Sequence, residues 1–202
     1  MLSTVAGNTL GNLILLVVLP MGAYLAWHRF RHGRELGEIL DRAGLRLGET
    51  RFLVPAGGMS LLVLVAAVVW HPSPEVMGGE GMASRLFVGA GLGGRTWLGA
   101  LLYGVVQTGF CEELFFRGMV TGSLARRMPD RAANLVQAGI FLLPHLLVLQ
   151  VAPTLWPLLG VIFVVSLVKG WLRMESGSMV GPWMIHATGN VTTALVVASQ
   201  SV

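Results

Sequence analysis

Long apolar stretches follow one another along this sequence, and short segments between them hold most of its charge. Each stretch approaches the roughly 20 residues that a helix needs to cross about 30 Å of hydrocarbon. Only 12% of the 202 residues are charged, whereas a soluble domain is nearer a quarter charged. The pattern predicts an all-α, polytopic transmembrane bundle that forms a single domain, residues 1–202. The predicted spans, about six, are 9–27, 52–70, 96–120, 134–151, 154–171 and 179–198.

The segments between the spans predict how the chain lies in a cell membrane. Residues 28–51 have the spacing of an amphipathic helix, which we expect on the membrane surface between the first two spans. Basic residues are concentrated in the first, third and fifth linkers, and the last of these is taken to hold Lys169 and Arg173. The positive-inside rule makes these linkers cytoplasmic, so both termini are predicted to be extracytoplasmic.

Three further features of the sequence limit the possible folds and functions. Residues 71–95 are rich in Pro and Gly and indicate a loop, with an extra span or a re-entrant helix at 86–92 left open. The net charge of +4 suits membrane lipid, and the absence of a basic tract with interleaved aromatics argues against nucleic acid. Cys111 is the only cysteine, which excludes disulfides and a multi-cysteine zinc site.

Two adjacent carboxylates and an arginine interrupt the third predicted span. A central charge in a bilayer costs about 2.5–3.5 kcal/mol, so such residues face a protein-lined cavity and have partners. Glu113 and Arg117 are four residues apart and are predicted to pair on one helix face. Glu112 points about 100° away and is the freer carboxylate. The competing interpretation places all three at the cytoplasmic rim, with Arg117 snorkelling to water.

Polar residues also interrupt the fourth and sixth predicted spans. His145 follows Pro144, which removes a backbone donor and predicts a kink beside the histidine. His186 and Asn190 are four residues apart, so both side chains can reach one ligand atom. The alternatives are a packed core histidine at 145 and a polar helix–helix contact at 186 and 190, worth about 0.6 kcal/mol.

These polar groups fall at similar depth, in the central to cytoplasmic half of the bilayer, when each residue adds about 1.5 Å of helix. A carboxylate and a histidine can together orient and deprotonate a water molecule, and a His/Asn pair can stabilise an oxyanion. The set therefore suits hydrolysis of an acyl bond. Cys111, beside the two glutamates, is a candidate nucleophile, but a small buried apolar residue is the favoured interpretation.

Three motifs, in this order on separate helices, carry a family resemblance. They resemble the CAAX protease and bacteriocin-processing family of intramembrane proteases, which includes the Rce1-type prenyl-protein endoprotease. The resemblance covers about residues 96–198, the predicted catalytic core. The motifs are Glu112-Glu113-x-x-x-Arg117, Phe141-x-x-x-His145 and His186-x-x-x-Asn190.

The resemblance implies an intramembrane endopeptidase. Glu112 would be the general base, His145 would orient the water, and His186 with Asn190 would form the oxyanion site. Glu113, Arg117 and Phe141 would support this arrangement. The implied substrate is a peptide or protein that is membrane-bound or lipid-modified.

A metal and two other functions remain as alternatives. Glu112, His145 and His186 are donor types that suit zinc, but the HExxH arrangement is absent and a metal-free glutamate mechanism is preferred. A non-catalytic immunity or scaffolding protein of the same family would keep the polar cluster for packing. A transporter with a proton relay is the third interpretation, and no inverted repeat supports it.

Overall fold

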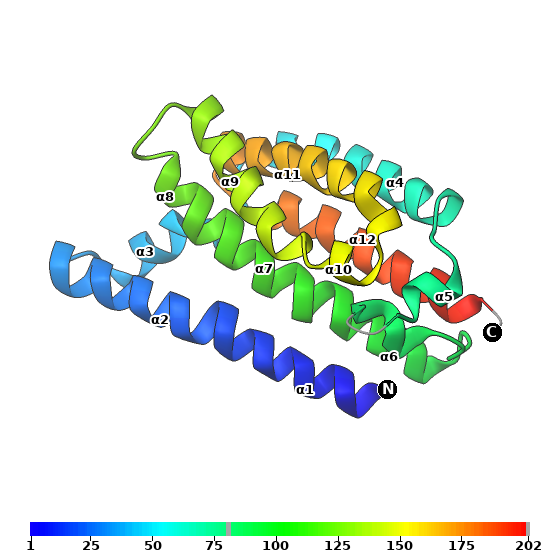
Figure 1. Cartoon of the computed structure of the whole chain (residues 1–202). Helices are drawn as coiled ribbons and strands as arrows, with labels where there is room; N and C mark the ends of the chain where they lie inside the picture. The colour runs from blue at the N-terminus through cyan, green and yellow to red at the C-terminus, as the bar shows by residue number, and fades with distance from the viewer. Residues whose placement is uncertain (80–81, 201–202) are drawn as a thin grey trace.

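The computed structural model describes residues 1–79 and 82–200, and its regular elements there are helices (Figure 1). Four helices are long and apolar enough to cross a membrane, which indicates a multi-pass membrane protein. They coincide with the first, second, fourth and fifth predicted spans. Their bounds are Leu2–Arg31, Thr50–Val69, Asp130–Gln150 and Pro153–Ser176.

Each of these long helices consists of two or more consecutive helical segments. Leu2–Arg31 runs without a break through its elements, and Pro153–Ser176 is nearly all α11. The elements are α1 (Leu2–Asn12), η1 (Leu13–Val18), α2 (Leu19–Ala26), η2 (Trp27–Arg31), η3 (Thr50–Phe52), α4 (Leu53–Val69), α9 (Asp130–His145), α10 (Val148–Val151), η7 (Pro153–Leu155) and α11 (Trp156–Ser176).

Helices also occupy the third and sixth predicted spans, and these are the two that carry the remaining motif residues. One is continuous from Gly94 to Leu124, and the other is α12 (Val180–Ser199). The first contains both glutamates and the second contains His186 and Asn190, and neither is among the four helices named above. The elements of the first are α6 (Gly94–Leu101), η5 (Leu102–Phe110), α7 (Cys111–Glu113), η6 (Leu114–Thr121) and α8 (Gly122–Leu124).

The outward faces of the peripheral helices are apolar. α4 buries only Ala56 and Ser60 among its seventeen residues, while Val54 is 78% exposed. Large apolar side chains such as Leu15 and Val18 are similarly exposed along the first helix. Contiguous apolar surface of this extent is unfavourable in water and favourable against lipid. The surface therefore agrees with the composition in indicating a membrane protein.

The sequence predicts a kink at Pro144, and in the structure the helix continues through Pro144 and breaks just after it. α9 ends at His145, and α10 begins only at Val148. Proline has no N–H to donate to the carbonyl four residues earlier, so the regular ladder is lost there. The break leaves His145 at the end of α9, at a turn of the chain.

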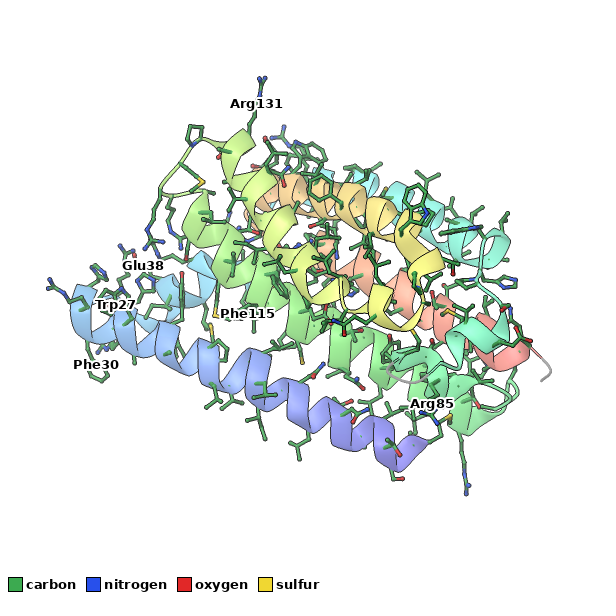
Figure 2. All side chains as sticks on the ribbon, viewed as in Figure 1. Trp27, Phe30, Glu38, Arg85, Phe115 and Arg131 are labelled. Carbon is green, nitrogen blue, oxygen red and sulfur yellow. The ribbon has the colours of Figure 1, made fainter. Side chains whose placement is uncertain are left out.

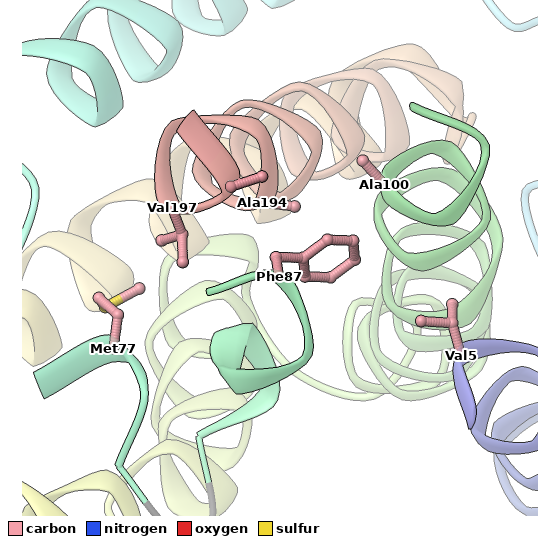
Figure 3. Close-up of a cluster of buried hydrophobic side chains, with 7 residues drawn as sticks. Val5, Met77, Phe87, Ala100, Ala194 and Val197 are labelled. Carbon is pink, nitrogen blue, oxygen red and sulfur yellow. The ribbon is translucent and has the colours of Figure 1, made fainter. Parts of the chain in front are cut away.

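The segments 28–51 and 71–95, which join predicted spans, form short elements. Within 28–51 the predicted amphipathic stretch is α3 (Leu36–Arg42), whose Ile39 is buried. Between Val69 and the start of α6 at Gly94, the described residues form only α5 (Pro74–Met77) and η4 (Ala83–Phe87), so this part of the structure has no extra span or re-entrant helix at 86–92. Phe87 is fully buried among Val5, Ala100 and Val197, which seals one end of the bundle (Figure 3).

Most basic residues gather at the opposite end of the bundle, where α3, α8 and the start of α9 meet (Figure 1). Arg173 donates to the carbonyl oxygen of Arg42 at 2.8 Å, and Arg126 donates to the Tyr24 hydroxyl at 3.1 Å. Arg131 projects from this end and Arg85 lies at the other, near both termini (Figure 2). We call the end of the bundle where α3, α8 and the start of α9 lie the Arg-rich end. It holds Arg29, Arg31, Arg34, Arg42, Arg46, Arg51, Arg126, Arg127, Arg131 and Arg173.

Candidate active site

Glu113 is the centre of the polar cluster and is fully buried. Its Oε1 atom accepts hydrogen bonds from Lys169 Nζ at 2.6 Å, His186 Nδ1 at 2.6 Å and Arg117 Nη1 at 3.2 Å. Arg117 Nε also lies 3.1 Å from Oε2 as an ion pair, without the orientation of a hydrogen bond. The predicted Glu113–Arg117 pair is confirmed, and the alternative of a snorkelling Arg117 is wrong because Arg117 is fully buried.

Lys169 belongs to this cluster, so its predicted place in the fifth linker is wrong. α11 continues to Ser176, past the predicted end of its span, and Lys169 is only 3% exposed within it. The sequence contained a signal for this, because a lysine flanked by apolar residues in a span is expensive unless it has a partner. Its partner is Glu113, from a helix far away in the sequence.

Arg117 and Lys169 both lie over the ring of Phe141. The distances to the ring centroid are 4.0 Å for the Arg117 guanidinium and 4.5 Å for Lys169 Nζ, within the range of cation–π attraction. Arg117 Nη2 also donates to Ser166 Oγ at 2.7 Å. The Phe141 ring therefore makes cation–π contacts with both buried basic side chains.

Glu112 and His186 face each other across a gap. Glu112 Oε2 lies 3.9 Å from His186 Nε2, and the Glu112 side chain is 19% exposed. As predicted, it is the freer of the two glutamates. The other ring nitrogen of His186 contacts a carboxylate, which in its ionised form only accepts, so Nδ1 carries the hydrogen in this network. Glu113 thereby aims Nε2 of His186 at Glu112.

Lys169 Nζ also lies 3.4 Å from His186 Nδ1. Both atoms are donors that converge on Glu113 Oε1, so this short distance is not itself a hydrogen bond. The contact shows how tightly α11 and α12 close around one carboxylate oxygen.

His145 also packs against Phe141. The ring centroid of Phe141 lies 4.7 Å from that of His145 and 6.0 Å from that of His186. Its Nδ1 lies 2.8 Å from the carbonyl oxygen of Phe141. A carbonyl only accepts, so Nδ1 donates, and in the neutral ring Nε2 is left with a lone pair.

Asn190 lies one turn beyond His186 on α12 but contacts a different helix. Its Nδ2 donates to Thr108 Oγ1 at 2.8 Å, and Thr108 Oγ1 donates in turn to the Tyr103 carbonyl at 2.9 Å. The structure thus fixes Asn190 against η5. An amide has two N–H groups, so one remains for a ligand.

The helix that carries the glutamates is π-helical on both sides of them, in η5 and η6. Such wider turns are rare and occur often at functional sites. Gly104 in η5 lets α12 approach closely, because a Cβ at this position would lie 2.6 Å from the backbone nitrogen of Val191. Local geometry thus brings α12 and its histidine against the glutamates.

Within residues 1–79 and 82–200, no three His, Cys, Asp or Glu side chains gather closely enough to hold a metal ion. Glu112 and His186 face one another, but His145 does not complete a group of three with them. The observed arrangement therefore does not fit the zinc alternative. Cys111 is fully buried, in agreement with its interpretation as a packing residue.

Comparison with known proteins gives one match. Residues 94–192 match the family model described as type II CAAX prenyl endopeptidase, Rce1-like. The matched region runs from the start of α6 into α12 and includes every side chain of the cluster described above. No curated protein and no solved structure matches the chain.

Proposed function

Because the chain belongs over residues 94–192 to the Rce1-like family of type II CAAX prenyl endopeptidases, we propose that it is an intramembrane endopeptidase. The observation that carries the proposal is the gap between Glu112 and His186. Glu112 is partly exposed and faces His186. Glu113 is fully buried and holds the His186 ring in its orientation. Separate roles for the two glutamates, one free and one bracing, suit catalysis better than packing alone.

In the proposed reaction Glu112 is the general base. It takes a proton from a water molecule whose second hydrogen is accepted by Nε2 of His145, and the water oxygen attacks the substrate carbonyl. The free N–H of Asn190 donates to the resulting oxyanion. His186 joins it once Nε2 has taken up a proton from water as the substrate binds, so that both ring nitrogens carry hydrogen, and this proton is released again with the product. Collapse of the intermediate breaks the C–N bond, and Glu112 returns its proton to the leaving amine.

We further propose that the six long helices all span the bilayer, with α3 at the cytoplasmic surface. The Arg-rich end then faces the cytoplasm, and both termini lie outside. Glu113, Lys169 and His186 each lie nearer the Arg-rich end of their helix than the other end. Their position supports a site in the cytoplasmic half of the bilayer, where substrate tails that enter from the cytoplasm would reach it.

Peptide cleavage by the purified protein tests the catalytic proposal. We expect hydrolysis of a membrane-anchored peptide near its C-terminus, tested with and without an isoprenyl group on the peptide. Glu112→Gln should lower the rate by roughly 100-fold to 10,000-fold because the general base is lost, while the melting temperature stays unchanged. Equal cleavage by Glu112→Gln would contradict the proposal and favour a non-catalytic scaffold. A chelator arm separates a metal-dependent reaction from a metal-free one.

Reporter fusions test the proposed orientation. Alkaline phosphatase folds only outside the cytoplasm, so a fusion to the C-terminus should be active and a fusion at 125–129 inactive. A fluorescent protein that matures only in the cytoplasm should give the opposite pattern at the same two sites. The reversed result would overturn the orientation, and matching signals at both sites would overturn the six-span count.

A further inference from the structure

We propose that Lys169, on a helix that carries none of the three motifs, is a positioning residue of the active site. It would hold Glu113 so that the His186 ring stays aimed at Glu112. This inference rests on the proposed function and deepens it. It assigns to α11 a part in the reaction, in addition to its part in packing.

The first support is the set of contacts that Lys169 makes. Its ammonium group touches Glu113 of α7 at 2.6 Å, lies 4.5 Å from the Phe141 ring centroid of α9, and is 3.4 Å from His186 Nδ1 of α12. One side chain therefore contacts a residue from each of the three motifs. All three contacts are already formed in the structure, inside the helix bundle.

The second support is charge. The cluster contains two carboxylates, Glu112 and Glu113, and two basic side chains, Arg117 and Lys169. Opposite charges balance only when Lys169 is present, because the two histidines are neutral in their ordinary form. A buried charge without a partner is strongly unfavourable. Without Lys169 the cluster would carry one excess negative charge, which a proton on Glu113 or His186 would relieve.

The third support is that two donors share one acceptor atom. Lys169 and His186 donate to the same oxygen, Glu113 Oε1, from adjacent helices. If Glu113 lost the ammonium group and took up a proton, its oxygen would become a weaker acceptor for His186 Nδ1. The ring would then be free to turn, and Nε2 would no longer be held toward Glu112. Lys169 acts through Glu113 and His186 and does not itself touch the substrate.

Three substitutions at this position separate charge from hydrogen bonding. Lys169→Met removes both, Lys169→Gln keeps a donor without the charge, and Lys169→Arg keeps both. We expect kcat to fall by about 10-fold to 100-fold in the Met and Gln variants, the same range as for the loss of a hydrogen-bond partner that orients a metal-bound histidine. KM should stay unchanged, and Lys169→Arg should recover most of the loss.

Arg173→Met is the matched control. Arg173 is a buried cation one turn further along α11, and its bonds go to the backbone oxygens of Arg117 and Arg42. Its loss should lower the melting temperature but leave kcat per folded molecule unchanged. If Lys169→Met does not fold, the comparison of Gln with Arg carries the test. Equal kcat in those two variants would overturn the role of the charge.

A spectroscopic measurement keeps this inference separate from the catalytic proposal. Imidazole ¹⁵N spectra of the detergent-solubilised protein, with His186→Gln to identify the signal, report the hydrogen bond at His186 Nδ1. We expect Lys169→Gln to shift this signal and Lys169→Arg to preserve it. If the wild type cleaves no peptide, the catalytic proposal fails while this spectrum still decides the positioning role. An unchanged His186 signal in Lys169→Gln would overturn it.

Discussion

Replacing Glu113 with glutamine is expected to lower the free energy of unfolding by about 3–5 kcal/mol, the cost of removing one partner from a buried ion pair. The amide cannot balance Arg117 and Lys169, which are both buried and both contact this carboxylate. His186 loses its anchor in the same step, so peptide cleavage should also disappear. Unfolding in detergent, followed by circular dichroism, and the peptide assay measure the two effects.

Glu112→Gln is the matched control for this prediction. It makes the same chemical change at the adjacent residue, where the side chain is partly exposed and its contact with His186 is beyond hydrogen-bond distance. We expect this variant to lose activity and keep its stability. If Glu113→Gln unfolds like the wild type, the buried cluster does not brace the bundle, and the division of roles between the glutamates is wrong.

Replacing Gly104 with alanine is expected to push α12 away from the glutamates. The added Cβ would lie 2.6 Å from the backbone nitrogen of Val191 and 3.2 Å from the carbonyl oxygen of Ala187. Backbone atoms cannot turn aside as a side chain can, so the two helices must separate. We expect a loss of about 1–3 kcal/mol in stability, typical of overpacking. A misplacement of His186 and Asn190 by about 1 Å should lower kcat by roughly 100-fold.

Gly139→Ala on α9 is the control for Gly104→Ala. A Cβ at Gly139 meets no atom within 4 Å, so the same substitution there should be neutral or stabilise the helix by up to about 1 kcal/mol. Melting curves and kcat for the two variants test the close approach directly. Equal stability and activity in both would show that η5 and α12 do not need to pack this closely.

Much of the fold was predictable because lipid-spanning helices have a simple signature. Long helices occupy all six predicted stretches, a break lies close to the kink predicted at Pro144, and the family resemblance is confirmed. The predicted ends of the helices were less accurate than their number and order. The first helix extends to Arg31 and the fifth to Ser176, because hydropathy falls at the ends while the helical hydrogen bonds continue.

The site was predictable only where its partners lie close in sequence. The Glu113–Arg117 pair follows from helical spacing, and so does the greater freedom of Glu112. The contact between Lys169 and Glu113 does not, because it depends on how α11 packs against α7. Thr108, the partner of Asn190, was missed for the same reason: a threonine in an apolar helix gives no sign of which helix it will face.

The distribution of charge over separate helices also matters while the protein is being made. The helix that contains Glu112 and Glu113 leaves the ribosome well before α11, so for a time it has two carboxylates and only Arg117 to balance them. Such a helix is costly to release into lipid. We expect it to remain at the insertion machinery until Lys169 arrives and both helices partition together. Assembly of the active site and insertion into the bilayer would then be a single event.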